Sequence, residues 1–191
     1  MQKIGCVVMA AGNARRFGKN KLAAQLNGRT LILRALEAVP AEQFDSVVVV
    51  TQYPEVMRLV KDFHFSAVHN EHPDYGISHT IELGLTSLRD CGGVLFLVSD
   101  QPLLRRESVA ELVRFWKAQP DKIAALGHNG VRGNPCLFPA RFFPELLELR
   151  EDHGGNTVIR RHEDDLVLLE VDEQELTDVD TPQALKEISG R

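Results

Sequence analysis

The chain has 191 residues, 43% of them apolar and 26% charged, which is ordinary for a globular protein and enough to bury a substantial core. Its formal net charge of −5 argues against a surface that coats nucleic acid, but it allows a small anionic ligand. The sequence holds no apolar run of the roughly 20 residues that cross a bilayer, and it does not begin like a signal peptide. We therefore expect one domain over residues 1–191, in the cytoplasm, with neither a nucleic-acid nor a membrane partner.

Short strand-like runs alternate with helical patterns along the chain. The alternation predicts an α/β fold, Rossmann-like with three α/β/α layers and a mostly parallel mixed sheet. Ligands of such sheets bind beyond the carboxyl ends of the strands, so functional residues should directly follow a strand. In chain order we predict a strand at 4–9, a helix at 31–36 that ends before Pro40, a strand at 47–50, a helix at 54–63, a strand at 66–69, a helix at 79–88, a strand at 94–98, a helix at 107–118, strands at 123–126 and 136–138 around a loop at 127–135, helices at 142–149 and 157–162, a strand at 166–171 and a helix at 182–188.

Three cysteines lie far apart in the sequence, at Cys6, Cys91 and Cys136. Because their number is odd and no C-x-x-C pair occurs, we expect neither a disulfide framework nor a zinc site. Each lies in or beside an apolar run, and we interpret all three as buried structural thiols.

The first strand leads into a loop of small and basic residues. Ala10, Ala11 and Gly12 come first, and Arg16 and Lys21 follow. Small residues let the backbone approach a phosphate closely, while arginine supplies a planar fork of donors and lysine a compact charge. The loop contains neither G-x-G-x-x-G nor the P-loop motif. It predicts a polyphosphate site of another kind, with a basic surface loop as the alternative.

Asp100 directly follows the strand predicted at 94–98, in the string Ser-Asp-Gln-Pro-Leu. A carboxylate at this position points into the ligand crevice of an α/β sheet. Mg²⁺ takes one or two carboxylates and fills its other positions with phosphate oxygens and water. Asp100 is therefore a candidate metal ligand, with the N-cap of the following helix as its alternative role.

The loop after the first strand resembles the A-A-G-x-S-x-R-F-G-x-x-K signature of the nucleotidyltransferases with a GT-A-like fold (nucleotide-diphospho-sugar transferases). Within that group the chain is most similar to the MobA-like NTP transferases, and closest to the molybdenum cofactor cytidylyltransferases of the MocA type. The resemblance implies that the loop wraps a triphosphate and that Arg16 and Lys21 contact its phosphates. Ala14 stands where the family often has serine, which removes a hydroxyl contact and leaves the backbone role.

The same resemblance pairs Asp100 with Asp180. The D-Q-P-L string at Asp100 resembles the family's metal-binding motif, and Thr-Asp-Val-Asp-Thr-Pro at residues 177–182 resembles its D-x-D-T-P string. This implies Mg²⁺ on Asp100 and Asp180, with Asp178 as a neighbour in at most a positioning role. The string around Asp180 is also a good helix start, and the resemblance alone implies that the two aspartates meet in space.

Residues 69–80 follow a strand and open a helix, and they resemble the family's segment that reads the nucleobase. Hydroxyls and backbone groups at a helix N-terminus suit that role. Ser78 and Thr80 are the implied contacts. Either side chain could instead cap the helix.

Gly133, Asn134 and Pro135 resemble the R-G-(H/x)-P segment of the family, in a loop that faces the acceptor substrate. Asn134 stands in place of the common histidine. Residues 151–157 match the family's G-D-x-G-A-R string in part, because the expected arginine is not in register.

The resemblance implies an Mg²⁺-dependent enzyme that transfers a nucleoside monophosphate from a nucleoside triphosphate to a phosphorylated acceptor and releases pyrophosphate. It favours CTP over GTP, because the A-A-G form with Ala11 is seen in cytidylyltransferases, whereas guanylyltransferases tend to have A-G-G. The implied acceptor is the molybdenum cofactor (molybdopterin), and the implied client is a molybdenum hydroxylase.

Two alternatives stay open. A sugar-phosphate or polyol-phosphate nucleotidyltransferase would use the same reaction type. A non-catalytic nucleotide-binding protein could assist the maturation of molybdoenzymes, although the presence of Lys21, Asp100 and Asp180 argues against it. A hydride-transferring enzyme is disfavoured because the glycine fingerprint of dinucleotide sites is missing.

Overall fold

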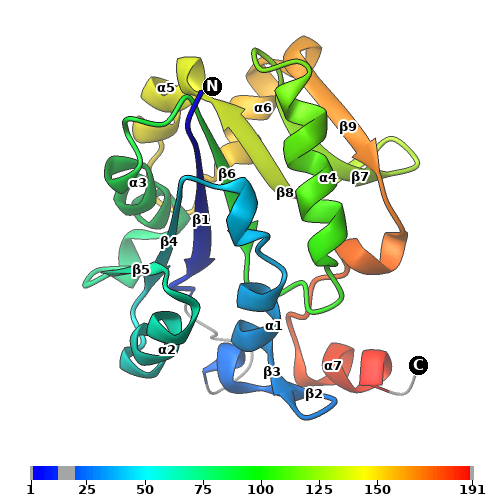
Figure 1. Ribbon diagram of the computed structural model, residues 1–191. Coiled ribbons are helices and arrows are strands. Elements are labelled where there is room, and N and C mark those ends of the chain that lie inside the picture. The colour runs from blue at the N-terminus through cyan, green and yellow to red at the C-terminus, as the bar shows by residue number, and fades with distance from the viewer. Residues whose placement is uncertain (1, 13–19, 190–191) are drawn as a thin grey trace.

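The computed structural model describes residues 2–12 and 20–189. Its centre is a seven-stranded sheet in the order β5-β4-β1-β6-β8-β7-β9, in which β8 is antiparallel to its neighbours β6 and β7 and the other pairings are parallel (Figure 1). This is the mostly parallel mixed sheet that the sequence predicts. The strands are β1 (Ile4–Ala10), β4 (Ser46–Thr51), β5 (Ser66–His69), β6 (Gly93–Val98), β7 (Ile123–His128), β8 (Val131–Pro139) and β9 (Leu166–Glu170), and a separate ladder joins β2 (Gln25–Leu26) to β3 (Arg29–Thr30).

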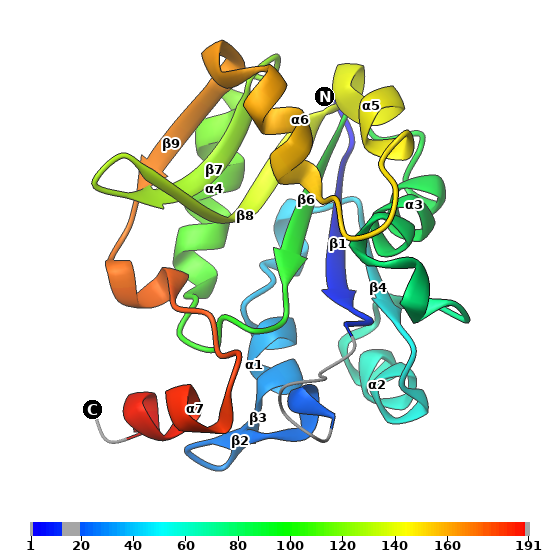
Figure 2. The ribbon, with the colours of Figure 1, turned by 180° about the vertical axis from the view of Figure 1, so that it is seen from behind.

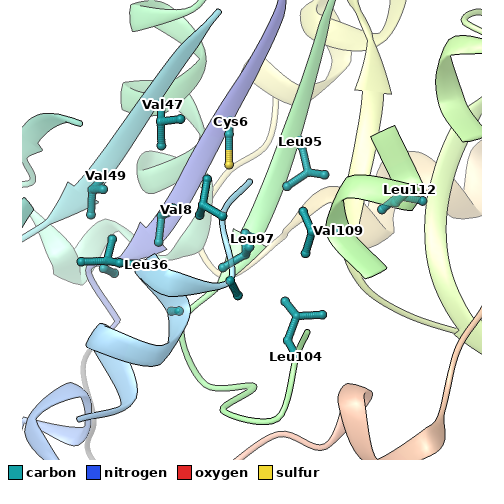
Figure 3. Packing of buried hydrophobic residues seen from close by; sticks show 14 of the residues in the cluster. Cys6, Val8, Leu36, Val47, Val49, Leu95, Leu97, Leu104, Val109 and Leu112 are labelled. Carbon is teal, nitrogen blue, oxygen red and sulfur yellow. The ribbon is translucent and has the colours of Figure 1, made fainter. Parts of the chain in front are cut away.

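Helices cover both faces of the sheet, because successive side chains of each central strand point to opposite sides. Cys6 and Val8 of β1 pack on one side with α1, α2 and α4 (Figure 3), whereas Val7 packs on the other side with α3, α5 and α6 (Figure 2). Both faces are buried, which explains the nearly continuous apolar runs of these strands. The helices are α1 (Leu31–Glu37), α2 (Pro54–Leu59), α3 (Ile77–Ser87), α4 (Arg106–Lys117), α5 (Phe143–Leu147), α6 (Gly155–Arg161) and α7 (Pro182–Ser189).

A third, smaller apolar cluster joins the β2–β3 hairpin and the start of α1 to the C-terminal segment around α7. Leu26 of β2, Leu31 of α1 and Val179 are buried at its centre, and Leu185 of α7 packs against it. Figures 1 and 2 both show α7 beside the β2–β3 hairpin. The segment before α7 is thus packed against the β2–β3 hairpin and the start of α1.

The predicted order of strands and helices is confirmed, but the loop predicted at residues 127–135 is wrong. β7 and β8 form an antiparallel hairpin there, and its turn residues Asn129 and Gly130 have φ angles of 50° and 75°. Asn-Gly favours a two-residue hairpin turn, because both residues adopt positive φ readily. The glycines that suggested a loop lie in this turn and in an irregular part of the strands.

Gly133, Asn134 and Pro135 therefore lie within β8, and not in a loop as expected. The register between β7 and β8 shifts between Ala125 and Gly127, opposite these three residues. A strand is expected to bulge where the ladder is interrupted in this way. Proline is tolerated at such a position, since it has no N–H group to donate to the ladder.

Cys6, Cys91 and Cys136 are buried and free, which confirms their interpretation as structural thiols. Burial raises the pKa of each of the three thiols, so that they stay protonated and unreactive at neutral pH. Within residues 2–12 and 20–189, no helix is long and apolar enough to span a membrane.

Candidate active site

A cavity of about 390 Å³ lies beyond the carboxyl ends of β1 and β6. Ala10, Ala11 and Gly12 form part of its lining, and Gly76 and Thr80 from the start of α3 form another part. This is the place where an open α/β sheet binds its ligands. The small residues after β1 thus lie where the sequence predicts a polyphosphate site.

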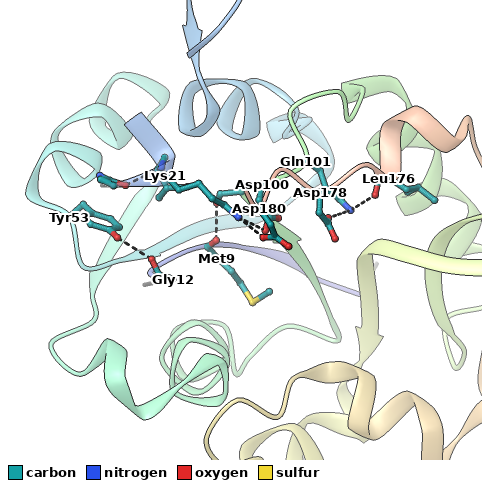
Figure 4. Close-up of polar contacts among 12 residues, drawn as sticks. Met9, Gly12, Lys21, Tyr53, Asp100, Gln101, Leu176, Asp178 and Asp180 are labelled. Carbon is teal, nitrogen blue, oxygen red and sulfur yellow. Dashed lines mark hydrogen bonds and ion pairs between the residues drawn. The ribbon is translucent and has the colours of Figure 1, made fainter. Parts of the chain in front are cut away.

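The segment after β1 is anchored by the segment that connects β4 to α2. The amide Nε2 of Gln52 donates to the carbonyl oxygen of Ala11 at 2.8 Å. The hydroxyl of Tyr53 donates to the carbonyl oxygen of Gly12 at 3.0 Å (Figure 4). Each bond fixes the orientation of one peptide plane at the wall of the cavity. Sequence patterns did not indicate Gln52 and Tyr53, because their role depends on the parallel pairing of β4 with β1.

Lys21 begins a short 3₁₀ turn (Lys21–Ala23) whose first residue follows the cap Asn20. Its ammonium Nζ lies 3.0 Å from Oδ2 of Asp100 and 3.0 Å from Oδ1 of Asp180, so that one cation bridges two carboxylates (Figure 4). Burial lowers the pKa of Lys21, but the charges and hydrogen bonds of Asp100 and Asp180 outweigh that effect and raise it overall. Lys21 is therefore charged at neutral pH, and the three residues form one cluster.

Asp100 lies two residues beyond the end of β6, and neighbouring hydrogen bonds hold its backbone. The hydroxyl of Ser99 donates to the carbonyl oxygen of Met9 at 2.8 Å, and the backbone N–H of Val179 donates to that of Asp100 at 2.8 Å. The second bond ties the end of β6 to the segment that carries Asp180. The structure thus brings together two aspartates whose proximity only the resemblance had implied.

Asp178 lies behind this cluster and does not contact Lys21. Its Oδ1 accepts a hydrogen bond of 3.0 Å from Nε2 of Gln101, which also donates to the carbonyl oxygen of Leu176 at 3.3 Å. Burial raises the pKa of Asp178, the nearby charge of Asp100 raises it further, and the bond from Gln101 opposes both. Gln101 therefore fixes the segment before Asp180. The D-Q-P-L string contained this residue, but nothing in the string revealed its partner.

Asp100 and Asp180 fit Mg²⁺ by the chemistry of their donor atoms. Among the residues that the structure describes, no three His, Cys, Asp or Glu side chains are grouped to hold a metal. The pair offers carboxylate oxygens around a position that already attracts the cation of Lys21, and Oδ1 of Asp100 is buried without a partner. Two carboxylates suit an Mg²⁺ ion that completes its coordination with phosphate oxygens and water.

Thr80 and Ser78 have different surroundings. Thr80 contributes to the lining of the cavity, and its Oγ1 accepts a hydrogen bond of 3.3 Å from Nδ2 of Asn70. Ser78 is buried, and its hydroxyl lies 3.5 Å from the carbonyl oxygen of Tyr75. Neither side chain caps α3, whose N-cap is Gly76 and has no side-chain cap. The alternative interpretation of both residues as helix caps is therefore wrong.

Gly76 permits the sharp entry into α3, and we expect Gly76→Ala to destabilise the protein by about 2 kcal/mol or more. Its φ of 85° is unfavourable for a residue with a Cβ atom, and that atom would lie 2.3 Å from the backbone of Glu151. Chemical denaturation of both proteins measures the difference. Gly130→Ala is a matched control, because Gly130 has a φ of 75° but nothing within 4 Å of the added atom. Equal losses in the two variants would contradict the role of the contact with Glu151.

The predicted acceptor residues lie apart from this cavity. Asn134 lines a second, neighbouring cavity, Gly133 packs against the side chain of Leu176, and Pro135 is buried. Arg16, the other predicted phosphate contact, lies outside the described residues.

The family model described as "MobA-like NTP transferase domain" matches residues 6–166. The chain belongs to the MobA-like NTP transferase family. The matched range includes the segment after β1, Lys21 and Asp100, whereas Asp180 follows it. The chain is therefore a member of a family of nucleotidyltransferases.

The chain is similar to three proteins whose names state different roles. The chain is 27% identical over 190 residues to the purine catabolism protein PucB of Bacillus subtilis, covering 93% of this chain and 91% of that protein. It is 31% identical over 131 residues to a 2-C-methyl-D-erythritol 4-phosphate cytidylyltransferase of Dehalococcoides mccartyi, covering 65% and 58%. It is 28% identical over 173 residues to a probable molybdenum cofactor guanylyltransferase of Thermococcus kodakarensis, covering 86% and 81%.

A solved nucleotidyl transferase from Methanothermobacter shares the fold. The two chains superpose with a TM-score of 0.82 at 21% identity, and the match covers 98% of this chain and 96% of the other. This likeness supports the nucleotide-diphospho-sugar transferase fold that the sequence predicts.

Proposed function

We propose that the protein transfers a cytidylyl group from CTP to the phosphate of the molybdenum cofactor and releases pyrophosphate. The observation that carries this proposal is the cluster in which Lys21 bridges Asp100 and Asp180, next to the cavity lined by Ala10, Ala11 and Gly12. Small residues, a cation and two carboxylates of the kind that bind Mg²⁺ together suit a polyphosphate site.

In the proposed reaction, an oxygen of the acceptor phosphate forms a bond to the α-phosphorus of CTP while the bond from that phosphorus to the pyrophosphate oxygen breaks. Such transfers depend on positioning and charge neutralisation more than on covalent catalysis. Lys21 would offset the charge that develops around the α-phosphate, and Arg16 would hold the leaving pyrophosphate. Because the acceptor phosphate itself attacks, the proposed reaction needs no nucleophilic side chain of the protein.

Asp100 and Asp180 would hold Mg²⁺ in this site. When bound, the ion neutralises phosphate charge and orients the reacting groups. In this structure the ammonium of Lys21 contacts Oδ2 of Asp100 and Oδ1 of Asp180, whereas Oδ1 of Asp100 has no partner. The ammonium of Lys21 would also meet the phosphates of a nucleotide, since Lys21 belongs to the lining of the cavity.

The preference for CTP over GTP rests on Ala11. Ala11 belongs to the lining of the cavity, and its carbonyl oxygen accepts a hydrogen bond from Gln52. The guanylyltransferases that the chain resembles tend to have glycine at this position, which leaves more room. Thr80 on the lining and Ser78 beside it are the proposed contacts to the base, whereas Gly133, Asn134 and Pro135 would lie on the side of the acceptor.

One similarity favours an alternative acceptor, and another favours a client enzyme that would receive the product. The similarity to a cytidylyltransferase of 2-C-methyl-D-erythritol 4-phosphate makes a polyol phosphate the second candidate for the acceptor. The similarity to a purine catabolism protein over most of both chains is consistent with a molybdenum hydroxylase of purine metabolism as the client.

The decisive assay incubates the protein and Mg²⁺ with CTP or GTP in parallel, and with molybdopterin or 2-C-methyl-D-erythritol 4-phosphate as the acceptor. We expect pyrophosphate from CTP with molybdopterin, and none after a chelator removes Mg²⁺. Release from GTP alone would overturn the assignment of the base, and release with the polyol phosphate alone would overturn that of the acceptor. Nucleotide binding without pyrophosphate from any pair would identify a non-catalytic binding protein.

A further inference from the structure

The segment that carries Asp180 is attached to the segment that follows β6 by a series of hydrogen bonds. Nearest to the site, the backbone N–H of Val179 donates to the carbonyl oxygen of Asp100 at 2.8 Å. One residue further from β6, the amide of Gln101 donates to the carbonyl oxygen of Leu176 at 3.3 Å (Figure 4). The partner's number falls as the chain moves away from β6, so the two segments run in opposite directions.

The far end of this attachment is an ion pair between Glu175 and Arg105. Glu175 belongs to a 3₁₀ turn (Glu173–Leu176), and Arg105 is the N-cap residue of α4. Oε1 of Glu175 accepts from Nε of Arg105 at 2.9 Å and from Nη2 at 2.6 Å, and Oε2 accepts from the backbone N–H of Arg105 at 3.0 Å. The carboxylate is thus held through both oxygens by a single residue.

The two partners of this ion pair differ in their exposure to solvent. The side chain of Glu175 is 4% exposed, whereas that of Arg105 is 62% exposed. A buried carboxylate is costly unless it is paired, and a buried ion pair often stabilises a fold no more than apolar residues of the same volume would. Its effect here is geometric, because the carboxylate must face a guanidinium and a backbone N–H at once. The pair therefore restricts where the turn can lie relative to the start of α4.

We propose that Glu175 and Arg105 are positioning residues, which set the separation of Asp100 and Asp180 and with it the affinity of the site for a divalent cation. Neither of them lines the cavity, so they act through the two segments that they join. If the ion pair is lost, the turn can shift, and the shift reaches Asp180 through the four residues between them. The inference rests on the proposed function, because it takes the two aspartates as the ligands of Mg²⁺.

The test titrates Mn²⁺ into the protein without nucleotide and measures the free ion by its electron paramagnetic resonance signal. Mn²⁺ is a suitable probe because it favours the same oxygen ligands as Mg²⁺. We expect Glu175→Gln and Arg105→Ala each to weaken the binding of Mn²⁺ by about 10-fold, the order found when a group that orients metal ligands is removed. Arg105→Lys keeps the positive charge and should restore part of the affinity that Arg105→Ala loses.

Arg106→Ala is the matched control, because Arg106 is the next residue along the chain and also pairs with a glutamate. Its guanidinium contacts Glu42 and donates to the carbonyl oxygen of Val39. These two partners lie between α1 and β4, and not in the segment before Asp180. Arg106→Ala should bind Mn²⁺ as the wild type does, even if its melting temperature falls.

A second measurement follows the attachment in the absence of any metal. The N–H of Val179 should exchange with deuterium faster in Glu175→Gln and Arg105→Ala, because the segment that carries it is less firmly held. The N–H of Asn70 donates to the carbonyl oxygen of Thr51 at 2.8 Å, in another part of the sheet, and its exchange should change little. Unchanged exchange at Val179 in both variants would refute the connection between the ion pair and the site.

The outcomes separate this inference from the proposed function. Equal Mn²⁺ affinity in the wild type, Glu175→Gln and Arg105→Ala overturns the inference and leaves the proposed reaction intact. A similar loss in Arg106→Ala also overturns it, because any weakening of the fold would then suffice. Weaker Mn²⁺ binding in the first two variants alone, without pyrophosphate from any nucleotide, supports the inference and refutes the transfer reaction. No binding of Mn²⁺ by the wild type, with or without nucleotide, refutes the metal site and this inference together.

Discussion

Lys21→Ala is expected to lower kcat by about 100-fold, and to raise the KM for the nucleotide by a much smaller factor. The ammonium offsets charge that is greater in the transition state than in the bound nucleotide, so its loss affects turnover more than binding. The structure adds a second effect, since the variant leaves Asp100 and Asp180 without the cation that both contact at 3.0 Å. We therefore expect Mg²⁺ alone to raise the melting temperature of the variant more than that of the wild type.

Steady-state kinetics and melting curves with and without Mg²⁺ provide both measurements. Lys61→Ala is the matched control, because Lys61 is exposed and lines neither cavity. An unchanged kcat in Lys21→Ala would refute the catalytic role. A change in KM alone would make Lys21 a residue of substrate binding.

Asp100→Asn should reduce activity roughly 1,000-fold, which corresponds to about 4 kcal/mol of activation free energy. The amide has the shape of the carboxylate but lacks its charge, so the proposed Mg²⁺ site keeps Asp180 alone. The activity that remains should require a higher concentration of Mg²⁺. Folding should change little, because Lys21 retains its contact with Asp180.

A titration of Mg²⁺ against the rate of pyrophosphate release checks this expectation. Asp62→Asn, on the exposed surface, controls for the loss of a negative charge elsewhere in the protein. If Asp100→Asn has the same Mg²⁺ dependence as the wild type, Asp100 is not a metal ligand. A large loss of stability in that variant would indicate that the aspartate is mainly structural.

The parts of the fold that sequence patterns predict are those with a local cause. Apolar runs at residues 4–9, 47–50 and 94–98 indicate strands that are buried on both faces, and the structure confirms them. The hairpin of β7 and β8 was missed, because glycine and proline indicate loops in general whereas Asn129-Gly130 specifies one turn. Its strands also depend on pairing with β6 and β9, which no local window contains.

In the candidate site, too, only the residues with a local signal could be predicted from sequence patterns. Asp100 could be identified because a residue directly after a buried strand of an α/β sheet lies at the ligand edge. The bridge from Lys21 to Asp100 and Asp180 spans 79 and 159 residues of sequence, so only a family resemblance could suggest it beforehand. Gln101 had no such indication, because its effect is on the segment before Asp180 and depends on tertiary contacts.

The small apolar cluster of Leu26, Leu31 and Val179 gives the charged cluster a common mechanical support. Lys21 is separated from Leu26 only by a short turn and the start of β2, and Asp180 directly follows Val179. Both charged residues therefore lie close in sequence to residues of this one cluster. Removal of α7 would disturb the packing of this cluster. We expect it to shift both Lys21 and Asp180. The spacing of the two charges thus depends on apolar packing between residues 26–31 and the C-terminal segment, at side chains that do not line the cavity.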